Sequence, residues 1–78
     1  MASSLEKVIA FHVSRLKDKR PDVRLKSIAE LQALGADAEA ALAALEECFK
    51  ESEEEEVKKA AQQAGYDIFM AVKKSKKE

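Results

Sequence analysis

The chain of 78 residues has few of the residues that form cross-links, linkers or membrane spans. Its single cysteine, Cys48, excludes an intramolecular disulfide and a zinc site made from several cysteines, and it fits a reducing compartment. With only two glycines and one proline, a flexible linker between two domains is not expected. No apolar run reaches the length of a membrane span, and the start has no cationic segment leading into an apolar one. We therefore expect one cytoplasmic domain with no membrane insertion.

What the sequence does contain is charge and aliphatic side chains. Charged residues make up 37% and hydrophobic residues 46% of the chain, a balance typical of helical proteins with solvated faces. The formal net charge of -1 provides no overall attraction to nucleic acid or to an anionic membrane.

Apolar residues recur at helical spacing and predict four helices. Pro21 favours a helix start and Gly35 a helix end. Asp37 can cap the third helix, and serine followed three residues later by glutamate forms a capping-box pattern twice, at Ser3 and at Ser52. The expected helices cover residues 4–17, 21–34, 38–50 and about 53–73.

The sequence also contains an internal repeat. Val23-Arg24 opens the second expected helix, and Val57-Lys58 opens the fourth about 34 residues later, so each copy is a helix, a turn and a helix. This unit resembles the HEAT repeat, especially the short HEAT-like repeats of the phycobilin lyase family. The resemblance implies an all-α fold of two HEAT-like hairpins, forming a short α-solenoid or right-handed bundle. The expected single domain comprises repeat one over 4–35, repeat two over 37–72 and a basic tail over 73–78.

The resemblance also implies inward-facing positions and ion pairs. Asp18 is expected to pair with Arg24, and Glu51 with Lys58. The side chains expected to face the core are Val23, Ser27, Glu30, Leu31 and Leu34 in the first copy, and Val57, Ala61, Ala64, Gly65 and Ile68 in the second.

Enzyme signatures are scarce, and we expect no catalytic activity, cofactor or metal. His12 is the sole histidine, and the two glycines stand alone, so no zinc motif or phosphate-binding loop can be drawn. A Cys48–His12 nucleophilic pair would lack an orienting third group. His12 occupies the position of Leu45 in the repeat, which predicts partial burial, and Cys48 is expected to pack as a small hydrophobe.

Two surfaces are candidates for partner recognition. A rotation of about 100° per residue from Val23 and Val57 predicts a mixed apolar and amide stripe on the second helices of the repeats. Methionine and aromatic side chains are common at such contacts. The alternative is that Ile28 and Tyr66 pack against each other. The predicted stripe comprises Leu25, Ile28, Gln32, Gln62, Tyr66 and Met70.

The second surface lies on the first helix, where Phe11 and Val13 fall outside the main apolar stripe. A two-repeat chain exposes both ends of its core, so these residues could form a homodimer contact. A self-sufficient four-helix bundle would instead bury them.

The leading hypothesis is a small scaffold or adaptor that binds another protein. An accessory subunit of an enzyme or assembly factor acting on pigment–protein complexes is the alternative, from the repeat resemblance alone. Weak nucleic-acid binding ranks third, because the basic cluster around the first turn is interrupted by Asp18 and Asp22. That cluster contains Lys17, Lys19, Arg20, Arg24 and Lys26.

Overall fold

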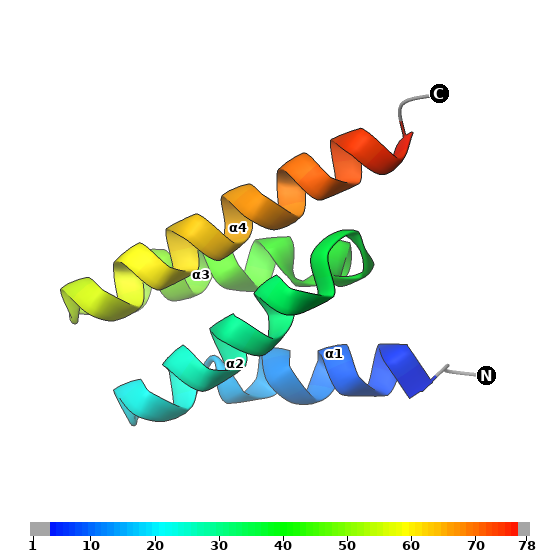
Figure 1. The fold of residues 1–78 in the computed structure, drawn as a ribbon. Coiled ribbons are helices and arrows are strands. Elements are labelled where there is room, and N and C mark those ends of the chain that lie inside the picture. The colour runs from blue at the N-terminus through cyan, green and yellow to red at the C-terminus, as the bar shows by residue number, and fades with distance from the viewer. Residues whose placement is uncertain (1–3, 77–78) are drawn as a thin grey trace.

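The structure is a computed structural model that describes residues 4–76. Within this range α1 (Ser4–Arg15) and α2 (Pro21–Leu34) form one antiparallel hairpin, and α3 (Leu42–Glu51) and α4 (Glu55–Lys76) form a second. The 3-10 helix η1 (Gly35–Ala41) connects them. The hairpins stack through α2 and α4, which run in the same direction (Figure 1). The prediction of an all-α fold with two helical hairpins is confirmed.

Proline defines the boundary between α1 and α2. Arg20 has the extended φ of -82° and ψ of 123° that a following proline favours, and Pro21 occupies the first turn of α2. α1 ends at Arg15 rather than at residue 17, because the backbone N–H of Asp18 donates to the carbonyl of Arg15 at 3.0 Å and closes a tighter turn. Ser3, half of the first expected capping box, lies outside the described residues.

Gly35 ends α2, as predicted, with a φ of 62° that favours glycine. The helix expected over 38–50 is different in the structure, because a 3-10 helix with a kink at Ala38 precedes α3. This kink places Ala38 and Ala41 in the core, both at 0% exposure. Asp37 lies exposed inside η1 and does not cap α3.

α4 begins two residues after the expected position 53 and extends beyond the expected end at 73. Ser52 is the C-cap of α3 rather than the N-cap of α4, which begins at Glu55, and its hydroxyl accepts a hydrogen bond from Arg24. Lys73, Lys74 and Lys76 lie in the last turn of α4, where the helix dipole favours cations. The rest of the predicted tail, residues 77–78, lies outside the described residues.

The core forms where the two hairpins meet, and α4 contributes the longest stripe to it. Most of the predicted inward positions are buried, but Glu30 is exposed and that prediction is wrong, since Leu31 takes the core position at 0% exposure. Leu34 and Gly65 are half-buried. The buried members of the predicted set are Val23, Ser27, Leu31, Val57, Ala61, Ala64 and Ile68.

Candidate functional site

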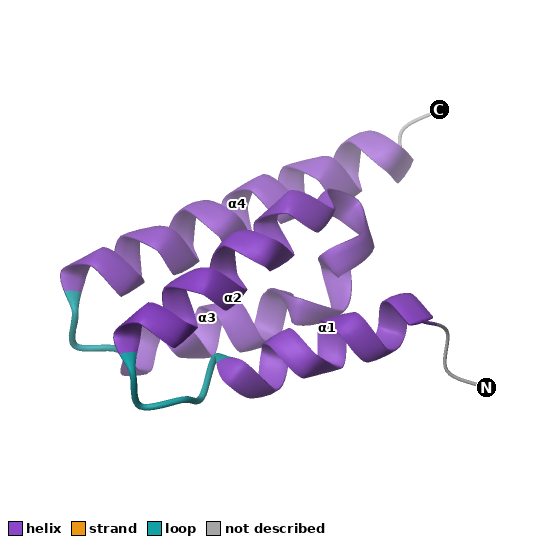
Figure 2. Ribbon diagram, turned by 60° about the horizontal axis from the view of Figure 1, so that its bottom comes forward, coloured by secondary structure: helices purple, strands orange, loops and turns teal. Residues whose placement is uncertain are grey.

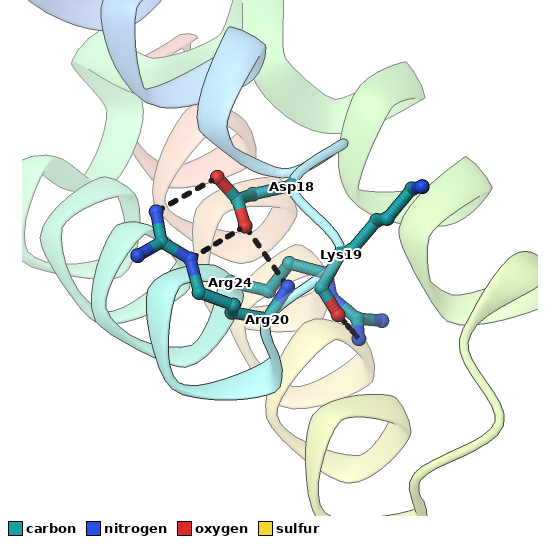
Figure 3. Close-up of polar contacts among 4 residues, drawn as sticks. All are labelled: Asp18, Lys19, Arg20 and Arg24. Carbon is teal, nitrogen blue, oxygen red and sulfur yellow. Dashed lines mark hydrogen bonds and ion pairs between the residues drawn. The ribbon is translucent and has the colours of Figure 1, made fainter.

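The two inter-helix loops lie at the same end of the molecule (Figure 2), where Arg24 joins them. Arg24 Nη1 donates to Ser52 Oγ at 2.7 Å. Arg24 Nη2 donates to the carbonyl of Lys19 at 3.2 Å (Figure 3). Nη2 also lies 3.2 Å from Glu54 Oε1, which is an ion pair without a hydrogen bond. We call Arg24, Ser52, Glu54 and the Lys19 carbonyl the turn clamp. Because Arg24 is only 8% exposed, the clamp holds the two hairpins together from inside.

Neither of the two ion pairs implied by the resemblance is present in the part of the chain that the structure describes. Asp18 does not pair with Arg24 but with Arg20, whose Nε lies 3.1 Å from Asp18 Oδ1 (Figure 3). Among the described residues, Glu51 and Lys58 form no ion pair, and Lys58 Nζ lies 5.7 Å from the ring centroid of Phe49. The second copy of the pattern therefore lacks the clamp of the first.

The Asp18–Arg20 contact also controls the ionisation of its members. The side chain and the backbone N–H of Arg20 both donate to the Asp18 carboxylate, and together they lower the pKa of Asp18 to about 2. The same pair raises the pKa of Arg20. With Arg20 paired and Arg24 buried, two members of the predicted basic cluster are already engaged within the chain.

A cavity of about 560 Å³ lies beside the turn clamp. Its lining carries both signs of charge, with Lys17 and Lys19 opposite Glu47 and Glu51, and Cys48 contributes the thiol. As predicted, Cys48 is buried and His12 is half-buried. His12 Nδ1 lies 3.3 Å from Ser27 Oγ, so the histidine is hydrogen-bonded to α2. No group of three or more histidine, cysteine or acidic side chains in residues 4–76 is arranged to hold a metal ion.

A second hollow, of about 320 Å³, lies between α3 and α4. We call it the α3–α4 groove. Tyr66 and Phe69 are 60% and 50% exposed at its edge, and Gly65 leaves open space, since a Cβ added there would meet nothing within 4 Å. The groove is lined chiefly by apolar and aromatic side chains: Leu42, Leu45, Phe49, Ala61, Tyr66 and Phe69.

Lysines flank the aromatic rings of this groove. Lys58 Nζ lies 5.7 Å from the Phe49 centroid, and Lys73 Nζ lies 5.6 Å from the Phe69 centroid. Glu46, which also lines the groove, is paired with Lys50 at 3.5 Å. A lysine therefore lies beside an aromatic ring toward each end of the groove along α4.

The structure divides the predicted partner stripe into two parts. Gln62 and Tyr66 line the α3–α4 groove, and Met70 is 41% exposed one turn beyond Tyr66. The exposure expected at Ile28 is wrong, because α4 covers α2 and leaves Ile28 1% exposed. Its predicted alternative, packing against Tyr66, does not account for the 60% exposure of that tyrosine.

The other two members of the stripe, on α2, make contacts within the chain. Leu25 is half-buried and packs against the core. Gln32 donates a hydrogen bond to Asp67 of α4. Neither lies with Gln62 in the groove.

Three groove residues were not predicted as surface. Gly65 was expected to face the core, and neither Phe49 nor Phe69 was assigned to a partner surface. A signal was present, since Gln62, Tyr66 and Phe69 follow one another at helical spacing and share a side of α4.

On α1, Phe11 is 55% exposed, while Val13 is half-buried and packs against the core. Leu5 and Val8 are also exposed, at 37% and 43%. The guanidinium of Arg15 lies 5.2 Å from the Phe11 ring centroid. The apolar surface on α1 therefore comprises Leu5, Val8 and Phe11 rather than the predicted pair.

Comparison with known protein families agrees with the fold of two helical hairpins. A sequence model of HEAT repeats matches residues 3–64, which is most of the chain. The chain belongs to the HEAT-repeat family. HEAT repeats generally mediate protein–protein interactions and are typically non-catalytic.

The match is to HEAT repeats in general, so the narrower resemblance to the phycobilin lyase repeats stays a prediction. No curated protein and no solved structure gave a significant match to the chain. None of the helices in the described range combines the length and the apolar character that a membrane crossing requires.

Proposed function

We propose that this HEAT-repeat chain is a small non-catalytic adaptor that holds part of another protein in the α3–α4 groove. The observation that carries the proposal is the pair of exposed rings, Tyr66 and Phe69, beside the open space over Gly65. Aromatic side chains at a hollow supply large contact area at a low cost in conformational entropy, and they are enriched among residues that dominate binding energy.

Met70 extends this surface along α4, and Gln62 adds an amide at its edge. A partner that covers the groove removes both rings from water and can hydrogen-bond to Gln62 and to the Tyr66 hydroxyl. No covalent step is required, since binding alone would link the partner to whatever else the chain contacts.

Capture experiments test the groove against a matched surface. Immobilised wild-type protein is compared with a Tyr66→Glu/Phe69→Glu double variant and with Phe11→Glu, which charges an equally exposed ring on α1. We expect the double variant to lose captured proteins that the wild type and Phe11→Glu retain, because a carboxylate in the groove cannot be desolvated by an apolar partner. Thermal unfolding of both variants should stay close to wild type, since all three rings are exposed.

Equal capture by the wild type and the double variant would contradict the proposal. Loss of capture in Phe11→Glu alone would assign the contact to α1 instead. The exposed Leu5, Val8 and Phe11 support self-association through α1 as a second candidate. Light scattering over a dilution series distinguishes it, because a dimer through α1 would become monomeric on Phe11→Glu.

A further inference from the structure

Repeat one contains positions equivalent to those of the α3–α4 groove, and there the structure shows which element covers them. Val57 follows Val23 by 34 positions, and the same offset relates Ile28 to Gln62, Leu31 to Gly65 and Gln32 to Tyr66. In repeat one, Ile28 and Leu31 are 1% and 0% exposed, because α4 lies against α2. In repeat two this side of the hairpin is the α3–α4 groove, which no element of the described chain covers. The groove is thus the stacking side of repeat two.

From this equivalence, and resting on the proposed function, we propose that the groove binds an amphipathic α-helix of another polypeptide, with an acidic residue near its start and a large apolar residue two turns later. A helix is inferred because a helix, α4, occupies the same side of repeat one. Since α4 and α2 run in the same direction (Figure 1), the bound helix is inferred to run in the direction of α4.

The acidic residue follows from the turn clamp. In repeat one, Arg24 is paired with Glu54, the residue directly before the covering helix α4. Lys58 holds the equivalent position in repeat two and has no acidic partner among residues 4–76. An acidic side chain at the start of the bound helix would reach Lys58 as Glu54 reaches Arg24.

The large apolar residue follows from the substitution of leucine by glycine. Leu31 fills the core of repeat one, whereas Gly65 leaves the groove of about 320 Å³ open at the equivalent position. A leucine or phenylalanine from the bound helix fits that space and packs against Leu42, Tyr66 and Phe69. Gly65 lies seven positions after Lys58, so in a parallel helix the apolar residue follows the acidic one by about seven residues.

A second copy of this chain does not fit the groove. The face of α4 that meets α2 carries small residues at helical spacing, with Ala64 fully buried and Ala60 packed against the core. The equivalent positions on α2, Lys26 and Glu30, are charged and exposed. Stacking repeat one on the groove of another copy would desolvate both charges, so the outer side of repeat one acts as a polar cap.

The test is selection from a phage-displayed library of helical peptides. The first turn varies among glutamate, glutamine and lysine, and the positions facing the groove vary among alanine, serine, leucine and phenylalanine. On the wild type we expect glutamate in the first turn together with leucine or phenylalanine seven residues later. The glutamate peptide should bind about three- to fivefold more tightly than its lysine counterpart, the effect of one partly exposed ion pair.

Two complementary variants sharpen the selection. Lys58→Glu should reverse the first-turn preference to lysine, whereas Lys59→Glu, which makes the same charge change on a neighbouring exposed side chain, should not. Gly65→Leu restores the residue of repeat one and should shift the preferred groove-facing residue from large to alanine or serine. Both shifts are expected because each variant changes one of the two inferred contacts.

The outcomes separate this inference from the proposed function. Peptides that require Tyr66 and Phe69 but show neither preference would overturn the inference and leave the groove as a docking site. If no selected peptide loses binding to the Tyr66→Glu/Phe69→Glu variant, both the inference and the proposed function are overturned. A wild-type dimer that this double variant abolishes would assign the groove to a second copy of the chain and would also overturn the inference.

Discussion

The second helices of the two repeats carry equivalent positions in different surroundings. α2 is covered by α4, and its positions Arg24, Ile28 and Leu31 are all less than a tenth exposed. On α4 the equivalent positions are Lys58, Gln62 and Gly65, none of which is buried. The side that repeat one uses for its own stability is therefore left open by repeat two, and this difference supports a binding role for the groove.

The sharpest way to break this comparison is to place alanine at the equivalent position of both repeats. Leu31→Ala should cost about 4 kcal/mol of unfolding free energy, because Leu31 is fully buried and its removal leaves a cavity. Gly65→Ala should instead stabilise the chain by up to about 1 kcal/mol, since alanine has the higher helix propensity and its Cβ meets open space. Urea unfolding measures both. A destabilised Gly65→Ala variant would show that the groove is less open than the structure indicates.

The cations at the equivalent positions allow a second comparison. Arg24→Ala removes the centre of the turn clamp and leaves the Ser52 hydroxyl and Glu54 without their cation, so we expect a loss of about 3 kcal/mol. Lys58→Ala should cost at most about 1 kcal/mol, because it loses only a partly exposed contact with Phe49. The same unfolding measurement checks this pair, and equal losses would remove the distinction between the two repeats.

The smallest expected effect on the free energy of unfolding concerns Asp18 in the first inter-helix turn. The pKa of Asp18 is lowered to about 2 from 3.8 by the hydrogen bonds from Arg20, so the folded chain binds fewer protons than the unfolded chain between these values. The Asp18 contribution to stability is therefore present above about pH 4 and is lost as the pH falls through 2. NMR titration of the carboxyl carbon should give a midpoint near 2 in the wild type.

Asp18→Asn is the control for this pH dependence. Its unfolding free energy should fall less steeply than that of the wild type between pH 4 and 2, because the titrating carboxylate is gone. Identical slopes would show that the Asp18–Arg20 contact does not form in solution. Glu51, which follows Asp18 by 33 positions, has no equivalent arginine two residues later, so the contact belongs to the first turn alone.

Helix positions were largely predictable because their signals are local. Pro21 and Gly35 restrict the backbone through their own covalent structure, and α2 has the predicted bounds. The resemblance to HEAT repeats placed Val57, Ala61, Ala64 and Ile68 in the core correctly. The kink at Ala38 was missed, since it depends on packing two alanines into the core rather than on a local sequence preference.

The candidate site was only partly predictable. Gln62, Tyr66 and Met70 were found from helical rotation, but the same rotation placed Ile28 on the surface although α4 covers it. Which side of a helix is free depends on its neighbours, and a single helix pattern does not contain that information. Phe49 and Phe69 were missed as groove residues for the same reason.

The sequence by itself determined the helical content, the repeat of about 34 residues and the positions of the first turn and of Gly35, since these depend on neighbouring residues along the chain. Only the tertiary structure decided that Arg24 pairs with Ser52 and Glu54 rather than with Asp18. It alone also decided that the open side lies between α3 and α4. The Arg24 contacts join residues that are distant in sequence, and which side of α4 stays open depends on which side lies against α2. Both are decided only when the hairpins stack.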